Sequence, residues 1–343
     1  SLSVAALKDR GFEKIPSYGV EPIDVPGAVA GWMTLHERFG KLPLEEVMAP
    51  AIRYAEEGYP VTPNISRLWQ EAFENYSKYR DRPEFQGWFD TFAPNNTWLK
   101  PGEMFRCPDM AKTLKEIAAT KGESFYRGAI AEKIDAFFKK HNGFLTKEDL
   151  AAFKPEWVDP ISVNYHGVDV WELPPNGHGI TVLMALQILK DMKLGERDCV
   201  DTMHKQIEAM KLAMVDTAQY VAEPSYMKVS VDQLLSEKYA AKRRALINDQ
   251  AIMPEPGEPG CPSTVYFCCA DGEGNMVSFI QSNFRGFGSG IVVPGTGISL
   301  NDRAENFKFD ENHANALAGG KRPYHTIIPG FLTQDGKPLG PFG

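Results

Sequence analysis

The sequence predicts a protein of mixed α and β structure with layered, covered strands. Residues 264–281 have the pattern of a β-hairpin around a turn at 271–275, and residues 161–173 have that of two strands around a turn at 166–167. Capped, amphipathic helical segments occupy much of the remaining chain. Because neither strand of the 264–281 hairpin alternates apolar and polar residues cleanly, both of its faces are expected to be buried.

Helix boundaries are predicted from proline, glycine and capping residues together with apolar periodicity. The predicted helices are residues 27–39, 44–57, 63–80, 110–119, 128–140, 180–189, 202–221 and 230–247, with a short one opened by the capping box at 146–149. Residues 81–108, rich in aromatic residues, Asn and Pro, are expected to form a long surface excursion. One stripe of the 202–221 helix is expected to pack in the core: Met203, Ile207, Met210, Met214, Ala218 and Val221.

Composition excludes several classes of function. The 343 residues carry a net charge of −8 without a basic block, which argues against nucleic-acid binding. No apolar run approaches the roughly 18 residues of a membrane span. The sequence contains no H-E-x-x-H, P-loop lysine, G-x-S-x-G or C-x-x-C motif. We therefore expect neither a metal nor a cofactor.

The five cysteines do not form a disulfide framework, which favours a cytoplasmic location. Residues 1–8 lack the features of a signal peptide. The chain has no initiator Met, however, and a missing N-terminus carrying a signal peptide would make the protein periplasmic or secreted. The sequence leaves these locations open.

Few single residues stand out as chemical candidates. Residues 248–262 are too rich in Pro and Gly for a regular element and are interpreted as a mobile linker. Thr264 follows this linker at the start of the hairpin. Of the seven histidines, His178 and His325 lie in Pro- and Gly-rich surroundings that favour a functional role.

Segments along the whole chain resemble the γ-glutamyltransferase family, in family order. They are residues 25–32 (VPGAVAGW), 39–46 (FGKLPLEE), 49–61 (APAIRYAEEGYPV), 125–128 (FYRG), 143–150 (GFLTKEDL), 173–180 (LPPNGHGI), 263–266 (STVY), 288–298 (GSGIVVPGTGI) and 321–329 (KRPYHTIIP). The resemblance implies an α+β, four-layer αββα sandwich of the N-terminal-nucleophile hydrolase type, present here as a fragment. The chain is thus identified as a member of this family.

The resemblance further implies a precursor that cleaves itself between Ser263 and Thr264. Residues 1–263 would belong to the large subunit, with 248–262 as its mobile tail, and residues 264–343 would begin the small subunit. Thr264 would be the nucleophile, and its freed α-amine, which titrates at about pH 8, would be the base. Acyl transfer from a small γ-glutamyl amide such as glutathione, through a covalent acyl-enzyme, is the implied reaction.

The implied substrate pocket departs from the family pattern. Asn306 stands where the family has an acidic residue that holds the donor α-amino group, and Arg303 stands in place of a glutamine or glutamate. His325 and Thr326 replace two serines that hold the donor carboxylate. Val265 follows the nucleophile where the family has a second Thr. These differences also fit a glutaryl- or cephalosporin-acylase-like amidase.

The resemblance places one family arginine before residue 1 and the oxyanion-hole glycines beyond Gly343, so this chain alone is expected to be inactive. A non-catalytic family member acting as a binding protein, and a cysteine hydrolase using Cys268 or Cys269, are the alternatives. A homo-oligomer is possible.

Overall fold

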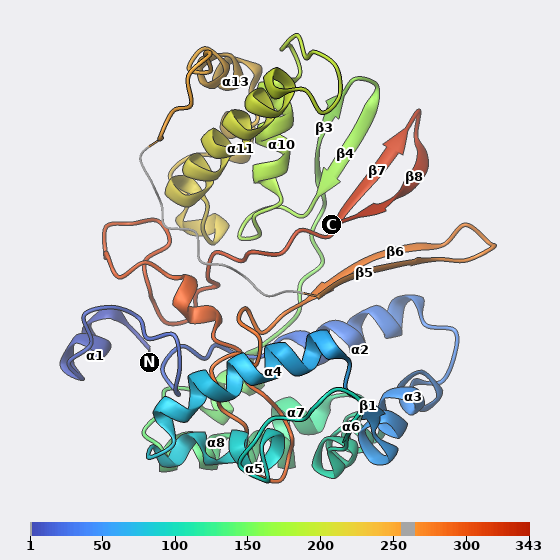
Figure 1. The fold of residues 1–343 in the computed structure, drawn as a ribbon, viewed down its shortest axis with the longest axis vertical. Helices are drawn as coiled ribbons and strands as arrows, with labels where there is room; N and C mark the ends of the chain where they lie inside the picture. The colour runs from blue at the N-terminus through green and yellow to red at the C-terminus, as the bar shows by residue number, and fades with distance from the viewer. Residues whose placement is uncertain (1, 255–264) are drawn as a thin grey trace. The chain divides into compact units, whose positions relative to one another are not determined.

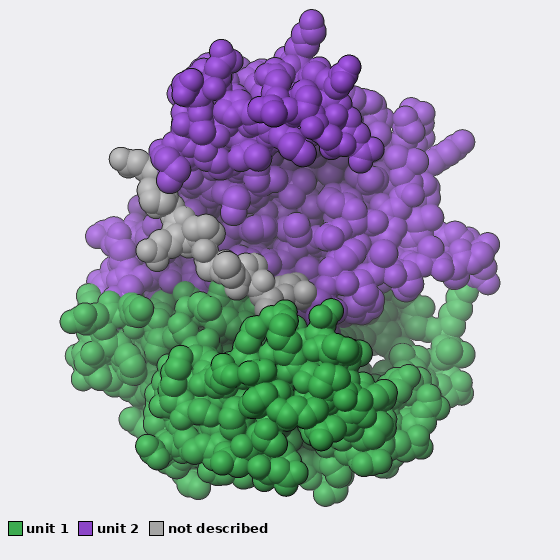
Figure 2. All heavy atoms as spheres, in the orientation of Figure 1, with its two compact units in different colours: residues 1–156, 283–305 green, residues 157–282, 306–343 purple. Residues whose placement is uncertain are grey.

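The computed structural model describes residues 2–254 and 265–343 (Figure 1). It divides into two compact units, which Figure 2 distinguishes by colour. Unit 1 comprises residues 1–156 and 283–305, and unit 2 comprises residues 157–282 and 306–343. Ser263, Thr264 and most of the predicted linker lie outside the described residues. Residues 248–254, which are described, contain no helix or strand.

Unit 1 is mainly helical, with one short two-stranded ladder between β1 and β2. Its elements are α1 (Val4–Asp9), α2 (Ala28–Phe39), α3 (Leu44–Glu57), β1 (Tyr59–Pro60), α4 (Pro63–Tyr76), η1 (Ser77–Tyr79), η2 (Pro83–Phe85), α5 (Gln86–Phe92), β2 (Met104–Phe105), α6 (Pro108–Thr120), α7 (Glu123–Arg127), α8 (Ala129–Lys140), α9 (Lys147–Ala152) and the start of η4 (Arg303–Asn306). The predicted capping box is present, with Thr146 and Asp149 bonding reciprocally at the start of α9.

The expectation of a surface excursion at residues 81–108 is wrong for its first part. Phe85 and Trp88 are fully buried and Phe89 is almost so. These rings recur at helical spacing along η2 and α5, and they pack with Tyr76 of α4 in the core of unit 1. Aromatic density here indicates core rather than loop.

Residues 283–305 return to unit 1 and run through its interior. Ile291, Val292 and Val293 are buried in the same core. Gly87 of α5 packs on the Val292 carbonyl, from which a Cβ at that position would be only 2.2 Å away. Gly288, with φ of +65°, approaches the Leu300 carbonyl just as closely. The backbone therefore turns closely at Gly288.

Unit 2 is built on an antiparallel sheet in the order β3-β4-β7-β8. The strands are β3 (Ile161–Tyr165), β4 (Val168–Glu172), β7 (Gly330–Gln334) and β8 (Lys337–Phe342). The predicted strand pair at 161–173 is confirmed, and its turn places His166 at φ of +51°. Val163 and Val170 on one face of the sheet pack against Leu183.

Helices of unit 2 cover this sheet: α10 packs on β3 and β4, and α11 packs on α10 (Figure 1). The helices are α10 (Ile180–Leu189), α11 (Val200–Tyr220), η3 (Pro224–Tyr226), α12 (Val231–Leu234) and α13 (Glu237–Arg244). The single helix predicted at 230–247 is thus two, because Ser236 caps a new one.

The apolar stripe predicted for the core is mostly on the surface of α11. Met203, Ile207, Met210 and Met214 are 47%, 58%, 37% and 39% exposed. The opposite face of α11 carries Ala209, Leu212 and Ala213, and these buried residues contact the core. Small residues on that face allow α11 to approach α10 closely, so the larger methionine side chains point outward.

The predicted hairpin is present as β5 (Val265–Ala270) and β6 (Met276–Gln281), paired from Val265↔Gln281 to Ala270↔Met276. The expectation that both faces are covered is wrong for the described residues, because Val265 is 66% and Phe267 48% exposed. Among the described helices, not one combines the length and apolar character needed to cross a bilayer.

Candidate active site

Thr264, the predicted nucleophile, and Ser263, its partner in the predicted cleavage site, lie outside the described residues. The chain is described again from Val265, which opens β5 and pairs with Gln281 of β6. Cleavage at 263–264 and the nucleophilic role of Thr264 therefore stay predictions.

The loop at 174–179 and the segment at 321–326 are held together by backbone hydrogen bonds. The His325 N–H donates to the Asn176 carbonyl at 3.0 Å, and the His178 N–H donates to the His325 carbonyl at 3.0 Å. The Asn176 side chain adds a bond from Nδ2 to the Pro323 carbonyl at 2.7 Å. We call this arrangement the 176–325 clasp. It fixes the backbone of His325, directly before Thr326.

The side chain of His178 extends the clasp toward the helices. Its Nδ1 lies 2.6 Å from the Tyr324 hydroxyl, and Tyr324 also bonds Thr181 of α10. Thr181 in turn lies 2.8 Å from the Thr217 hydroxyl of α11. Burial lowers the pKa of His178 and raises that of Tyr324, so both are neutral at pH 7. This network positions the clasp without adding a charge to it.

Asn315 connects Asn306 to the clasp. Its buried amide donates from Nδ2 to the Asn306 carbonyl at 2.7 Å and accepts from the Tyr324 N–H at 3.0 Å. Three of the four predicted substrate-binding residues, Asn306, His325 and Thr326, are thus brought together in unit 2. The Asn306 Nδ2 atom is buried and has no acceptor among the described residues.

Arg303, the fourth predicted residue, belongs to unit 1 and is only 2% exposed. Its guanidinium lies 5.2 Å from the centroid of the Phe284 ring. Burial lowers the pKa of Arg303 to about 10, although the negative charges of Asp24 and Asp302 act to raise it. Burial likewise raises the pKa of both carboxyls to about 7. A role for Arg303 in substrate binding stays a prediction.

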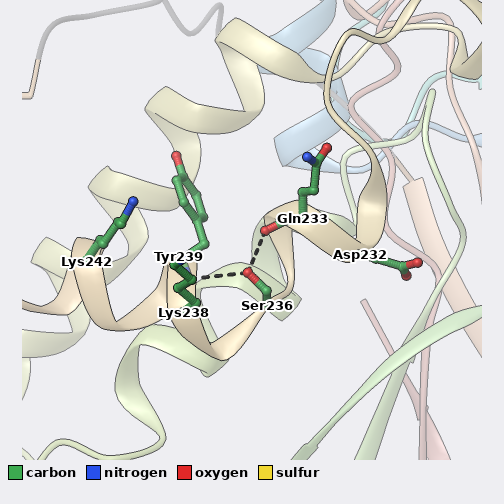
Figure 3. Close-up of a pocket in the computed structure, with 6 residues that line it drawn as sticks. All are labelled: Asp232, Gln233, Ser236, Lys238, Tyr239 and Lys242. Carbon is green, nitrogen blue, oxygen red and sulfur yellow. Dashed lines mark hydrogen bonds between the residues drawn. The ribbon is translucent and has the colours of Figure 1, made fainter.

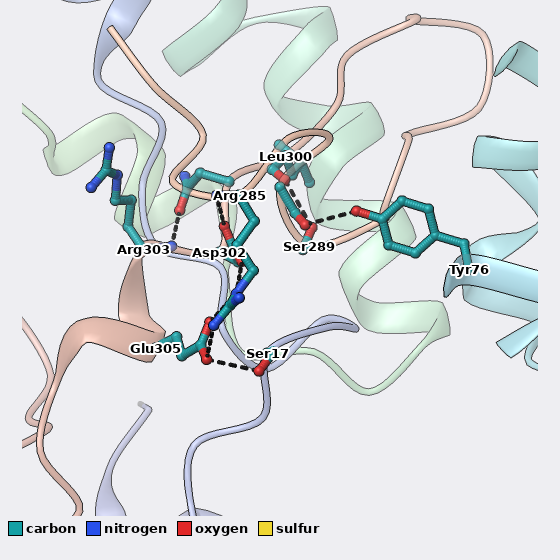
Figure 4. Close-up of polar contacts among 10 residues, drawn as sticks. Ser17, Tyr76, Arg285, Ser289, Leu300, Asp302, Arg303 and Glu305 are labelled. Atoms are coloured by element: carbon teal, nitrogen blue, oxygen red, sulfur yellow. Dashed lines mark hydrogen bonds and ion pairs between the residues drawn. The ribbon is translucent and has the colours of Figure 1, made fainter. Parts of the chain in front are cut away.

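Figure 4 shows the polar contacts that hold residues 283–305 in unit 1. Arg285 donates to both carboxylate oxygens of Glu305, at 2.8 and 2.7 Å, and the Ser17 hydroxyl donates to Glu305 Oε1 at 2.7 Å. Hydrogen bonding to Glu305 raises the pKa of Arg285, so this arginine is charged at any accessible pH. These contacts place η4, which carries Arg303.

Other described features do not match the predicted chemistry. The cavity in Figure 3, about 390 Å³, is lined by residues of α12 and α13 and contains none of the predicted site residues. Ser236 and Gln233, which line it, are helix-capping groups. No cluster of metal-ligating side chains occurs in residues 2–254 or 265–343. Cys268 and Cys269 are both exposed on β5.

Sequence reasoning missed Asn315 and Tyr324, which connect the clasp, and it did not single out Glu172, which is buried on β4. The Asn315 side chain bonds backbone groups nine residues away on either side, and the Tyr324 hydroxyl bonds the side chains of His178 and Thr181, so no local pattern marks either residue. Glu172 left a weak signal. It lies two residues after Val170 on β4, and period-two alternation therefore places it on the buried face.

The chain resembles known proteins over its whole length. The sequence profile of the family described as Gamma-glutamyltranspeptidase matches residues 2–343. The glutathione hydrolase-like YwrD proenzyme of Bacillus subtilis (strain 168) is 33% identical over 332 residues, covering 96% of this chain and 62% of that protein. Acylase ACY 1 proenzyme of Pseudomonas sp. (strain SE83) is 33% identical over 325 residues, covering 93% and 57%.

The crystal structure of cephalosporin acylase from Bacillus halodurans matches with a TM-score of 0.96 and 56% identity, covering 100% of this chain and 63% of that one. The chain therefore spans between 57% and 63% of the length of these three proteins. The predicted fold class, α+β of the N-terminal-nucleophile hydrolase type, is confirmed.

Proposed function

Because the chain belongs to the gamma-glutamyltranspeptidase family, we propose that the full-length protein is a threonine amidohydrolase or acyltransferase that cleaves its own precursor between Ser263 and Thr264. The whole-length family match carries this proposal. Relatives named as proenzymes support the self-cleavage. The position of Thr264, directly before the described start of β5, supports its role as the first residue of the small subunit.

The proposed chemistry needs one hydroxyl and one amine. Cleavage frees the α-amine of Thr264, which takes the hydroxyl proton as the oxygen attacks the amide carbonyl carbon. The carbon–nitrogen bond breaks, the leaving amine departs with that proton, and the acyl group remains as an ester on Thr264. Water or an acceptor amine then attacks the ester and releases the acyl group.

The two proposed subunits, residues 1–263 and 264–343, would remain partners after cleavage. Each compact unit contains described sequence from both sides of the cleavage site. In unit 2, β4 from the first piece pairs with β7 from the second. A cut between them breaks none of these hydrogen bonds.

For the substrate, the family suggests a γ-glutamyl amide such as glutathione. Asn306, His325 and Thr326, together with Arg303, would bind the acyl part. The clasp supports this role for His325 and Thr326 because it fixes the backbone of His325, directly before Thr326, beside Asn176. His178 and Tyr324 are neutral, so these two residues of the clasp network add no charge to recognition.

A specific observation favours a second substrate class, a glutaryl or related amide without an α-amino group. Asn306 carries no charge, and its unbonded Nδ2 is a hydrogen-bond donor. The Nδ2 donor cannot bind an ammonium group, and the uncharged Oδ1 offers a weaker acceptor than a carboxylate; losing the charge-assisted contact costs about 1.5–3 kcal/mol. The similarity to a cephalosporin acylase supports the same choice.

Two measurements test the proposal on the full-length protein. Mass spectrometry should find a smaller piece that begins at Thr264, and Thr264→Ala should abolish both cleavage and turnover. An uncut chain that still turns over substrate would contradict the mechanism. Side-by-side rates on γ-glutamyl and glutaryl anilides then decide between the two substrate classes, with hydrolysis and transfer separated by adding an acceptor amine.

A further inference from the structure

The carboxyl of Glu172 is buried in unit 2 without a hydrogen bond. Glu172 is the last residue of β4 and is 1% exposed. Neither of its oxygens has a partner among the described residues. A buried polar group without a partner is costly, so each such group in a folded protein calls for a functional or structural reason.

Two glycines enclose this carboxyl. A Cβ at Gly179 would lie 2.6 Å from Glu172 Oε2, and a Cβ at Gly330 would lie 2.8 Å from Oε1. Gly179 ends the clasp loop and precedes α10, and Gly330 begins β7. The carboxyl therefore lies directly against the backbone of both segments, where no larger residue fits. We call this arrangement the Glu172 cradle.

The cradle suits a neutral carboxyl. Burial raises the pKa of Glu172 to about 7. Glu208 on α11 is equally buried, but it pairs with Lys211 and accepts from the Ile252 N–H, and its pKa is lowered. Unit 2 thus contains two buried glutamates whose pKa values are shifted in opposite directions.

Contacts connect the cradle to the strand that follows Thr264. The Phe342 ring of β8 packs against Gly330 beside Glu172. The Phe342 carbonyl accepts a 3.4 Å bond from Ser278 of β6, whose hydroxyl lies 3.1 Å from that of Tyr266 on β5. Gly343 packs directly on the Tyr266 ring. Tyr266 comes two residues after Thr264 in the sequence.

The charged and titratable neighbours of the cradle are few. Tyr266 on β5 responds to Glu172: its pKa is raised mainly by burial, with Cys268 and then Glu172 adding smaller effects of the same sign. His178, in the clasp loop, is neutral because of burial. The remaining neighbours carry no charge: they are Ile161 of β3, which pairs with Glu172, Gly330 of β7 and Phe342 of β8. No cation among these groups offsets an ionised Glu172.

We propose that Glu172 is a positioning residue for acyl transfer at Thr264, holding β4, β7 and the start of β5 in their working arrangement as long as its carboxyl keeps its proton. This inference rests on the proposed function. Loss of the proton places an uncompensated negative charge against the backbone of Gly179 and Gly330. The clasp loop and β5 then shift, and turnover falls as pH rises.

The test is the pH dependence of kcat/KM for the cleaved full-length protein on its better anilide substrate. The wild type should gain activity as the Thr264 amine deprotonates and lose it as Glu172 ionises. Glu172→Gln keeps the shape of the neutral carboxyl and cannot ionise. Relative to wild type, it should raise the ratio of rates at high and low pH by about 10-fold. Glu172→Met, also uncharged, should act in the same direction.

Glu208→Gln is the matched control. It removes an equally buried carboxyl from the same unit and should leave the shape of the profile unchanged. If Glu172→Gln and Glu172→Met cleave and turn over with the wild-type profile, the role of Glu172 is refuted while the proposed function stands. If the wild type neither cleaves nor turns over, the proposed function fails, and the positioning role fails with it.

Discussion

Val170 of β4 pairs with Leu332 of β7 in the sheet of unit 2. The first residue precedes the proposed cleavage site and the second follows it. Trp171 strengthens the same junction by donating from Nε1 to the Thr333 hydroxyl at 2.9 Å. The sheet is therefore continuous across the two pieces that cleavage would produce, and its ladder does not depend on the peptide bond at 263–264.

The two pieces should stay associated after cleavage. We expect an affinity tag on the first piece to retain the second through gel filtration in native buffer, and denaturant to separate them. The physical reason is that each compact unit is built from segments of both pieces. Release of the small piece in native buffer would contradict the shared sheet. The uncleaved Thr264→Ala variant provides the control for a single species.

Substitution of Asn176 tests the clasp. Asn176→Ala removes the hydrogen bond from Nδ2 to the Pro323 carbonyl and leaves that partly buried oxygen without this donor. We expect a stability loss of about 1 kcal/mol and a raised KM, because the backbone of His325 loses one of its restraints. Asn164→Ala, in β3 next to its turn with β4, removes exposed hydrogen bonds to Asp169 and from the Gly167 N–H and should leave KM unchanged. Equal effects of both variants on KM would count against the clasp.

Substitution of Asn306 tests substrate choice. Asn306→Asp introduces the negative charge that a γ-glutamyl ammonium requires, so the rate ratio of γ-glutamyl to glutaryl anilide should rise by about 10- to 100-fold. Parallel kcat/KM measurements on the two anilides give this ratio. Asn312→Asp, a change of the same kind at an exposed turn, serves as the control. An unchanged ratio in Asn306→Asp would place the acyl group elsewhere.

Stability should depend on pH through Glu172. Its folded pKa of about 7 exceeds the ordinary value of 4.5, so the folded state keeps a proton that the unfolded chain loses first. Stability therefore falls as pH rises from about 4.5 to 7 and stays lower above it, by about 3 kcal/mol in total. Glu172→Gln removes this dependence. Urea unfolding at pH 4.5, 6 and 8 should show that the free energy of unfolding of the variant rises relative to that of wild type as pH increases.

Glu208→Gln should behave in the opposite way in the same experiment. The folded pKa of Glu208 is lowered mainly by bonding to Lys211 and the Ile252 N–H, which outweighs its burial. Its carboxylate therefore contributes stability above about pH 4.5 that is lost as pH falls. The variant should lose stability relative to wild type at pH 8. Parallel curves for the two glutamine variants would refute the opposite pKa shifts of the two carboxyls.

Local signals in the sequence determine much of the fold. The predicted bounds of α3 and α10 agree with the structure to the residue, and local residues mark three of these four ends: Pro43 and Gly58 bound α3, and Gly179 precedes α10. The hairpin of β5 and β6 is equally predictable from local sequence, since the Asp271 side chain accepts from the N–H groups of its own turn. These features need no tertiary information.

Long-range packing could not be predicted in this way. Which face of α11 is buried depends on how closely α10 approaches. The small residues Ala209 and Ala213 allow a close approach, so their face is buried and the methionines are exposed. Asn315 and Glu172 gain their roles from segments that the fold brings together. The family resemblance supplied His325, Thr326 and Asn306, but their joining through Asn315 is visible only in the structure.

The exposed stripe of α11 provides a last test, since its orientation reverses the sequence-based expectation. Met210 is 37% exposed, whereas Leu212, two residues on, is 1% exposed. Met210→Ser should therefore change the free energy of unfolding by no more than about 0.5 kcal/mol, and Leu212→Ala should cost about 2–5 kcal/mol. Urea unfolding of both variants measures the difference. A large loss from Met210→Ser in the full-length protein, or a change in its mass by light scattering, would mean that another segment or a second copy covers the stripe.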